Sequence, residues 1–144
     1  MSVQRVLLDS CVPLYALGAA SPWREPCRAV LTGLARGDLA AIASTEMIQE
    51  VVHHRLRMTT DRATAVLDAR DVAALVTVVP FDDAVLQAAL DLIARTSTLR
   101  GRDAVHAATA LCHGVTRVVS VDPAFDGVPG LTRLDPPAHL SDSA

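Results

Sequence analysis

Apolar positions along the chain follow two patterns: short continuous runs, and longer segments in which apolar residues recur every three or four positions. The runs predict strands at 3–8, 39–43, 76–80, 117–121 and 131–134. The longer segments predict helices at 12–17, 24–36, 45–57, 61–75, 82–95 and 103–113. Because strands and helices alternate, we predict an α/β fold with a central, mainly parallel sheet and helices on both faces.

The composition supports such a core. The chain has 144 residues, 51% of them hydrophobic, and only 3% of its residues are aromatic. The core must therefore consist mostly of Val, Leu, Ile and Ala, which suit buried parallel strands covered by helices. We expect a single domain over residues 1–135 and a loose C-terminal tail over 136–144.

Charge and cysteine content exclude several classes of protein. The net charge of -3 argues against a surface that is basic throughout, although it permits a local arginine patch. All 13 basic residues are Arg, so a phosphate-binding loop built on a lysine is excluded. The 3 cysteines form no C-x-x-C pair, and we expect them to be small buried side chains. No secretory signal pattern or long apolar run is present, so we expect a cytoplasmic protein without a membrane partner.

Four acidic residues follow or face the ends of predicted strands. Asp9 comes directly after the first strand, and Asp122 follows the strand at 117–121. Asp103 opens the helix that leads into the latter strand, and Glu50 lies in the second turn of the helix after the strand at 39–43. Because parallel strands present their carboxyl ends at one edge of a sheet, we expect these four side chains to gather there.

A cluster of carboxylates points to metal chemistry. Such a cluster repels itself unless a cation neutralises it, and oxygen ligands select Mg²⁺ or Mn²⁺. These ions polarise phosphoryl oxygens and activate water, so hydrolysis of a phosphodiester needs neither a lysine nor a nucleophilic side chain. Each acidic residue also has a structural alternative as a turn residue, a helix cap or a partner of a helix dipole.

Several segments that together span most of the chain carry a characteristic order of residues, namely Leu7-Leu8-Asp9-Ser10, then Glu50, then Arg102-Asp103-Ala104-Val105-His106-Ala107-Ala108, then Val119-Ser120-Val121-Asp122-Pro123-Ala124-Phe125-Asp126. This order resembles that of PIN-domain nucleases, and most closely the VapC-type toxins of bacterial toxin–antitoxin pairs. The resemblance implies an α/β/α sandwich, Mg²⁺- or Mn²⁺-dependent hydrolysis of RNA, a homodimer and inhibition by a cognate antitoxin.

The resemblance also implies roles for individual positions. Asp9, Glu50, Asp103 and Asp122 match the acidic residues of the family, which makes them the candidate catalytic and metal-binding residues. Ser10 and Ser120 match positions that often hold Ser or Thr beside the metal, which predicts a supporting role. Asp126 matches a position that is acidic only in some members, and its alternative role is to fix the turn at Phe125.

Two ambiguities concern residues near this cluster. Glu46 lies one helical turn before Glu50, but the first turn of a helix also favours an acidic residue for its dipole, so we prefer Glu50. Arg55, Arg57, Arg100 and Arg102 are candidate contacts to RNA phosphates. We favour Arg100 and Arg102, which immediately precede Asp103.

Alternative functions are less well supported. The serious one is a PIN-like module that binds RNA or protein without significant catalysis. A di-iron protein would need two Glu-x-x-His pairs, and only the pair Glu50 with His53 is present. We therefore expect His53, His54 and His106 to be helix-surface or core residues.

The family resemblance further suggests where an antitoxin would bind. The helices at 12–17 and 24–34 and the helix that begins at Thr45 are expected to form a groove. Tyr15 and Trp23 lie on these short elements near one end of the chain, and both are residue types that dominate binding interfaces. The alternative for Trp23 is that it simply covers the edge of the sheet.

Overall fold

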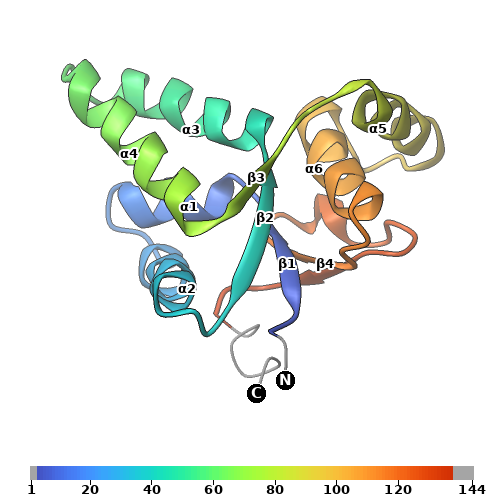
Figure 1. The fold of residues 1–144 in the computed structure, drawn as a ribbon, viewed down its shortest axis with the longest axis horizontal. Helices are drawn as coiled ribbons and strands as arrows, with labels where there is room; N and C mark the ends of the chain where they lie inside the picture. The colour runs from blue at the N-terminus through green and yellow to red at the C-terminus, as the bar shows by residue number, and fades with distance from the viewer. Residues whose placement is uncertain (1–2, 138–144) are drawn as a thin grey trace.

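The computed structural model describes residues 3–137, which form a five-stranded sheet flanked by helices (Figure 1). The strands are β1 (Arg5–Leu8), β2 (Ala40–Ser44), β3 (Thr77–Val79), β4 (Arg117–Val119) and β5 (Thr132–Leu134). The helices are α1 (Cys11–Leu17), α2 (Arg24–Arg36), α3 (Thr45–Met58), α4 (Arg62–Leu75), α5 (Asp83–Arg95) and α6 (Gly101–Cys112), with a 3₁₀ turn η1 (Pro123–Phe125). The predicted order of strands and helices is confirmed.

All neighbouring strands in the sheet are parallel, in the order β3-β2-β1-β4-β5. From β1 the chain adds β2 and then β3 on one side of the sheet. It then crosses back and adds β4 and β5 on the other side of β1. The direction of winding therefore reverses between β1 and β4. In open α/β sheets, the crevice at the carboxyl ends of the strands on either side of such a reversal is where ligands bind.

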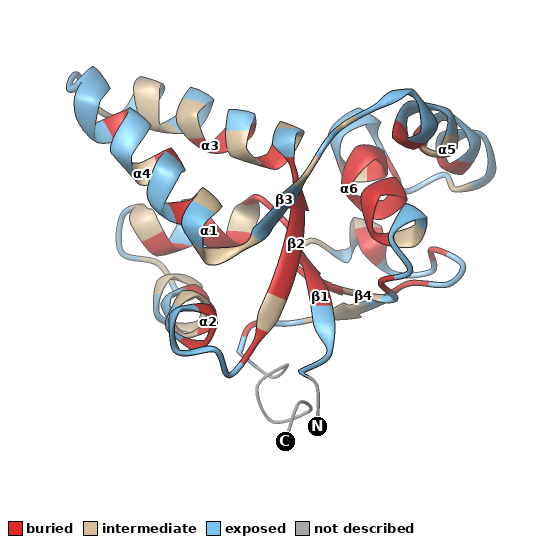
Figure 2. Ribbon diagram, in the orientation of Figure 1, coloured by how far each residue is buried: buried red, intermediate tan, exposed pale blue. Residues whose placement is uncertain are grey.

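The sheet separates two apolar layers because successive residues of a strand point to opposite faces. Val6 and Leu8 pack with α1 to α4, whereas Leu7, between them, packs with α5 and α6. Buried residues accordingly concentrate on the central strands β1, β2 and β4 and on the inner sides of the helices (Figure 2). The predicted α/β/α sandwich is confirmed, and its sheet is parallel throughout the described residues.

Helix α6 is the most deeply buried helix, since every residue of Ala104–Ala110 is buried. Small alanine side chains let it lie close to the sheet. The helix begins at Gly101, two residues before the predicted start, because Arg100 has the extended backbone of an N-cap and its carbonyl accepts from the N–H of Ala104 at 2.8 Å. Asp103 is consequently the third helical residue and does not itself open the helix.

Other boundaries differ from the predictions by at most two residues. Strand β4 ends at Val119, and the chain then leaves the sheet and forms η1, which the sequence did not predict. The Asp122 side chain caps η1 by accepting from the N–H of Ala124 at 2.9 Å. Asp122 therefore follows a short loop and not the strand itself. Residues 138–144 of the predicted tail lie outside the described residues.

The cysteines only partly follow the prediction. Cys27 is buried and Cys11 is half-buried, but Cys112 is exposed at the end of α6, so its predicted burial is wrong. Helix α6 packs its alanine face inward, and this leaves its last residue on the outside.

Over residues 3–137, none of the helices combines the length and apolarity that a membrane crossing requires.

Candidate active site

Asp9 is fixed at the junction of the two central strands. It extends the pairing of β1 with β4 by one residue, because its N–H donates to the carbonyl of Val119 at 3.2 Å. Asp9 is buried, with only 4% of the residue exposed. Its Oδ1 accepts from the N–H of Ser10 at 2.8 Å. Oδ2 accepts from the Ser120 hydroxyl at 2.7 Å. The carboxylate thus has one defined orientation at the switch point of the sheet.

Ser120 also connects Asp9 to Asp122. While its hydroxyl donates to Asp9, the same oxygen accepts from the N–H of Asp122 at 3.0 Å. Ser120 is fully buried, and the Sγ of Cys11 lies 3.5 Å from its hydroxyl. One buried hydroxyl therefore links two of the predicted acidic residues.

Glu50 reaches the same region from helix α3. It is buried, and its Oε2 accepts from the Ser10 hydroxyl at 2.9 Å. Its Oε1 lies 2.7 Å from Nε2 of His106 on α6. Helices α3 and α6 lie on opposite faces of the sheet (Figure 1), so this contact links the two layers.

His106 is the residue that the sequence interpretation missed. It is buried, as predicted, but it touches Glu50 and its Nε2 lies 3.9 Å from Oδ1 of Asp9. A signal was available in the sequence, because His106 follows Asp103 by three positions and residues so spaced share one face of a helix. His53 and His54 are exposed, which agrees with the helix-surface alternative of the prediction.

The charges of the cluster shift the ionisation of its members. Burial, followed by the charges of Asp9 and Asp122, raises the pKa of Asp103 to about 6. Burial also opposes ionisation of Glu50, but the hydrogen bond and charge of His106 outweigh it and keep the pKa of Glu50 below its usual value. Burial disfavours the cationic form of His106, yet its carboxylate neighbours raise its pKa. Burial and neighbouring carboxylates therefore both disfavour the charged form of Asp103.

The donor set fits a hard divalent cation by its chemistry. Carboxylate oxygens are the ligands that Mg²⁺ and Mn²⁺ prefer, and burial together with the charges of Asp9 and Asp122 raises the pKa of Asp103. Within residues 3–137, no group of three or more Asp, Glu, His or Cys side chains is arranged so that it could hold a metal ion. Asp9, Glu50, Asp103 and Asp122 therefore offer oxygens of the right chemical kind, but in this arrangement they do not form a metal site.

The neighbouring glutamate and arginines occupy the rim. Glu46 has a partly exposed side chain, and its Oε1 lies 3.8 Å from Nε of Arg102. Arg102 and Arg100 are both exposed beside the start of α6. By geometry Glu50 belongs to the cluster, whereas Glu46 pairs with an arginine at its edge. Arg55 instead pairs with Asp68 at 2.9 Å.

Among the described residues, Asp126 makes no hydrogen bond to Asp9, Glu50, Asp103 or Asp122. Its carboxylate pairs with Arg133 on β5, at 2.9 Å from Nε. Arg133 in turn donates from Nη1 to the carbonyl of Ser120 at 3.1 Å. Asp126 also ends η1, because its N–H donates to the carbonyl of Pro123 at 2.9 Å. The Asp126 side chain therefore pairs with Arg133, and its backbone N–H is the group that bonds the Phe125 turn.

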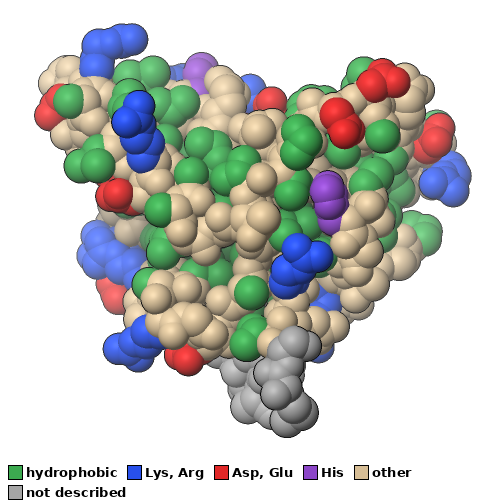
Figure 3. Space-filling view, viewed as in Figure 1, with side chains coloured by type: hydrophobic (Ala, Val, Ile, Leu, Met, Phe, Trp, Pro, Cys, Tyr) green, Lys and Arg blue, Asp and Glu red, His purple; other side chains and the backbone are tan. Residues whose placement is uncertain are grey.

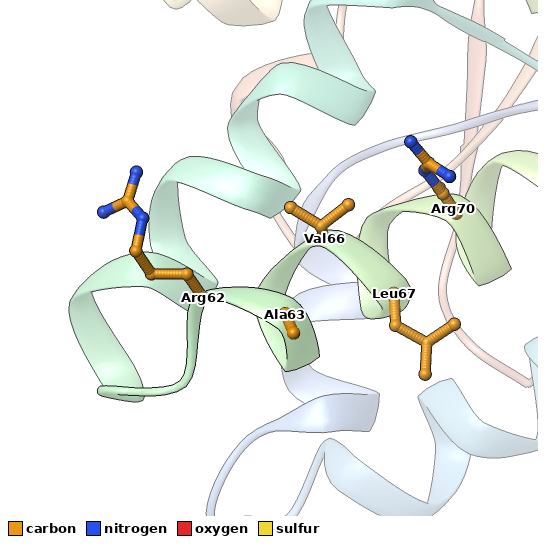
Figure 4. Close-up of a pocket in the computed structure, with 5 residues that line it drawn as sticks. All are labelled: Arg62, Ala63, Val66, Leu67 and Arg70. Carbon is orange, nitrogen blue, oxygen red and sulfur yellow. The ribbon is translucent and has the colours of Figure 1, made fainter.

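Two of the surface hollows outside the acidic cluster are lined partly by apolar side chains. One is lined by Cys11, Leu14, Tyr15 and His54, between α1 and α3. The other lies along a single face of α4, where Val66 and Leu67 are flanked by arginines (Figure 4); its lining residues are Arg62, Ala63, Val66, Leu67 and Arg70. On the face shown in Figure 3, arginines and acidic side chains are interspersed, in accord with the low net charge.

The fold and the site define a class of protein, an α/β/α sandwich with an acidic centre at the switch point of a parallel sheet. The family model of the PIN domain matches residues 6–131. The chain belongs to the PIN domain family, as its motifs predicted.

Relatives support this assignment along nearly the whole chain. Ribonuclease VapC7 of Mycobacterium tuberculosis is 36% identical over 142 residues, which cover 92% of each chain. Ribonuclease VapC13 of the same organism is 31% identical over 131 residues, 90% of this chain and 98% of the relative.

Solved structures share the fold at lower identity. VapBC2 from Rickettsia felis, bound to a DNA fragment of its promoter, superimposes with a TM-score of 0.71 at 12% identity and covers 92% of this chain and 98% of that one. FitAcB from Neisseria gonorrhoeae gives a TM-score of 0.67 at 21% identity, with coverage of 90% and 96%.

Proposed function

We propose that this protein is a metal-dependent endoribonuclease that acts as the toxin of a toxin–antitoxin pair. The observation that carries the proposal is the network that joins Asp9, Ser120 and Asp122 at the switch point of the sheet and brings Glu50 to the same edge. Family membership and relatives named as ribonucleases support the same reaction.

Each residue of the cluster has a distinct task in this proposal. Asp9, Glu50, Asp103 and Asp122 would hold Mg²⁺ or Mn²⁺. When bound, such an ion supplies Lewis-acid activation of a phosphodiester and makes water a stronger nucleophile at neutral pH. Ser10 and Ser120 orient the carboxylates through the hydrogen bonds at 2.9 and 2.7 Å.

The rim arginines would bind the RNA backbone. Arg100 and Arg102 expose their guanidinium groups beside the acidic cluster, and guanidinium groups bind phosphates through paired hydrogen bonds. Their positive charge also offsets repulsion between the acidic centre and a polyanionic substrate. We propose that these two residues position a single strand of RNA across the carboxylates.

A cognate antitoxin is the proposed protein partner. Two solved structures that share the fold are complexes named VapBC, which supports such a partner here. We propose that the antitoxin covers the face of α1 and α3, where the hollow beside Tyr15 and Leu14 is mostly apolar. A homodimer, which the family resemblance implies, is the proposed state of the toxin itself.

A turnover assay with purified protein tests the proposed function. Single-stranded RNA should be cleaved when Mn²⁺ or Mg²⁺ is added and left intact when EDTA removes the ion. The control is Asp103→Asn, which should bind RNA but not cleave it. RNA binding by the wild-type protein without cleavage under any of these conditions would favour the alternative, a PIN-like binding module without catalysis.

A further inference from the structure

In the described part of the chain, the imidazole of His106 makes a single hydrogen bond. Its ring is 1% exposed, and Nε2 lies 2.7 Å from Oε1 of Glu50. Among the described residues, Nδ1 is buried without a hydrogen-bond partner. A buried polar atom without a partner lowers stability, so an aliphatic side chain would suit this alanine-rich helix better. What a histidine contributes here is therefore the contact that its Nε2 makes with Glu50.

Glu50, by contrast, has a partner on each carboxylate oxygen. Ser10 donates to Oε2 and His106 faces Oε1, so the two contacts approach the carboxylate from the N-terminal end of α1 and from α6. A carboxylate only accepts, which assigns the donor role to Nε2 of His106 whatever the state of the rest of the ring. Without this contact, the Oε1 end of the side chain would be free to rotate away from the cluster.

We propose that His106 is a positioning residue, which orients the Glu50 carboxylate toward Asp9 across the edge of the sheet. The proposal rests on the proposed function of the acidic cluster, and it assigns His106 no direct contact with metal or RNA. The contact joins α3 and α6, which pack on opposite faces, so the orientation of Glu50 depends on how the two layers pack around the sheet.

Two substitutions of His106 separate orientation from packing. His106→Gln keeps an N–H donor at nearly the same reach, whereas His106→Leu fills similar space without a donor. Thr109→Val is the matched control, because Thr109 is also buried on α6 but donates only to the carbonyl of Val105 at 2.7 Å. Isothermal titration with Mn²⁺ and cleavage kinetics at saturating Mn²⁺ are measured for all three variants.

For His106→Leu we expect Mn²⁺ binding about 10–100-fold weaker and kcat lower by a similar factor, because loss of a group that orients a ligand has this effect. The KM for RNA should stay within about twofold of the wild-type value, since His106 does not face the substrate. His106→Gln should recover most of both losses, and Thr109→Val should change neither quantity. Wild-type Mn²⁺ affinity and kcat in folded His106→Leu would overturn the proposal.

A double-mutant cycle tests whether His106 acts through Glu50. If it does, adding His106→Leu to Glu50→Gln should cause little further loss of Mn²⁺ affinity beyond that of Glu50→Gln alone. Fully additive losses would overturn the proposal.

Nuclear magnetic resonance of the imidazole nitrogens tests the contact in the absence of metal and RNA. It also does not depend on whether His106→Leu folds. In the wild-type protein Nε2 should carry the hydrogen, and its resonance should shift on Glu50→Gln. An Nε2 without hydrogen would overturn the positioning role. Absence of RNA cleavage together with the expected resonance shift would instead refute only the proposed ribonuclease function.

Discussion

The hydroxyl of Ser120 lies 2.7 Å from Oδ2 of Asp9, so a side chain that follows β4 fixes the carboxylate that follows β1. The two residues are separated by 111 positions in the sequence. Their contact forms at the reversal of strand order, where ligands bind in sheets of this kind. The orientation of Asp9 therefore depends directly on a neighbouring strand.

Ser120→Ala should lower RNA cleavage by about 10–100-fold, because Asp9 would lose the donor that orients it. Stability should fall by about 1–3 kcal/mol, since the N–H of Asp122 also loses its acceptor. Cleavage rates and thermal melts measure the two effects. Ser44→Ala is the control, because Ser44 is equally buried but caps α3, so it should lose about 1 kcal/mol of stability without losing activity. Equal activities of the two variants would contradict this role of Ser120.

Asp103→Asn should stabilise the metal-free protein while abolishing cleavage. The pKa of Asp103 is raised to about 6 in the folded protein, above the unfolded value of about 4. A raised carboxyl pKa contributes stability below pH 4 that is lost as the pH rises through 6. The uncharged Asn avoids this loss, so at pH 8 the variant should be more stable by about 1–2 kcal/mol.

Thermal melts from pH 4 to pH 8, in EDTA and in Mn²⁺, measure this effect. The stability difference between variant and wild type in EDTA should widen between pH 4 and pH 7. Added Mn²⁺ should stabilise the wild type by about 2–3 kcal/mol at a hundredfold excess over its Kd, and the variant much less. A metal-free variant that melts below the wild type at pH 8 would show that Asp103 is not under charge repulsion.

Glu50→Gln should reduce cleavage far more than Glu46→Gln. Glu50 is buried between Ser10 and His106, whereas Glu46 is partly exposed and lies 3.8 Å from the mostly exposed Arg102. The Glu46 change should cost at most about 0.3–1 kcal/mol of stability through its interaction with the helix dipole. Cleavage rates of the two variants, with Mn²⁺ titrations beside them, decide the ranking. A greater loss of activity for Glu46→Gln would assign the catalytic glutamate to position 46.

Tyr15→Ala should weaken binding of the cognate antitoxin by about 2 kcal/mol or more with little change in melting temperature. Tyr15 is 36% exposed and lines the hollow between α1 and α3. Trp23, which the sequence also nominated, packs against the apolar layer of α1 to α4. Trp23→Ala should therefore act mainly on stability, with a loss of about 3 kcal/mol. Calorimetric titration with the antitoxin measures this binding. Unchanged affinity of Tyr15→Ala for the antitoxin would exclude the α1 face as its binding site.

The sequence by itself determined the order of elements and the edge at which the acidic residues gather. Periodicity is local, so strands and helices could be assigned from spacing alone. The topology of alternating elements then predicted a parallel sheet, whose carboxyl ends place Asp9 and Asp122 together. The exact starts of α6 and η1 escaped this reasoning, because they depend on the backbone of Arg100 and on a cap made by Asp122.

Only the tertiary structure decided how the side chains of the site are held. Glu50 and His106 are 56 positions apart and lie on opposite faces of the sheet, so no local pattern could pair them. The choice between Glu46 and Glu50 likewise depends on which turn of α3 faces the end of β1. Periodicity defines the face of a helix, but the distance between two faces is set by how the layers pack around the sheet.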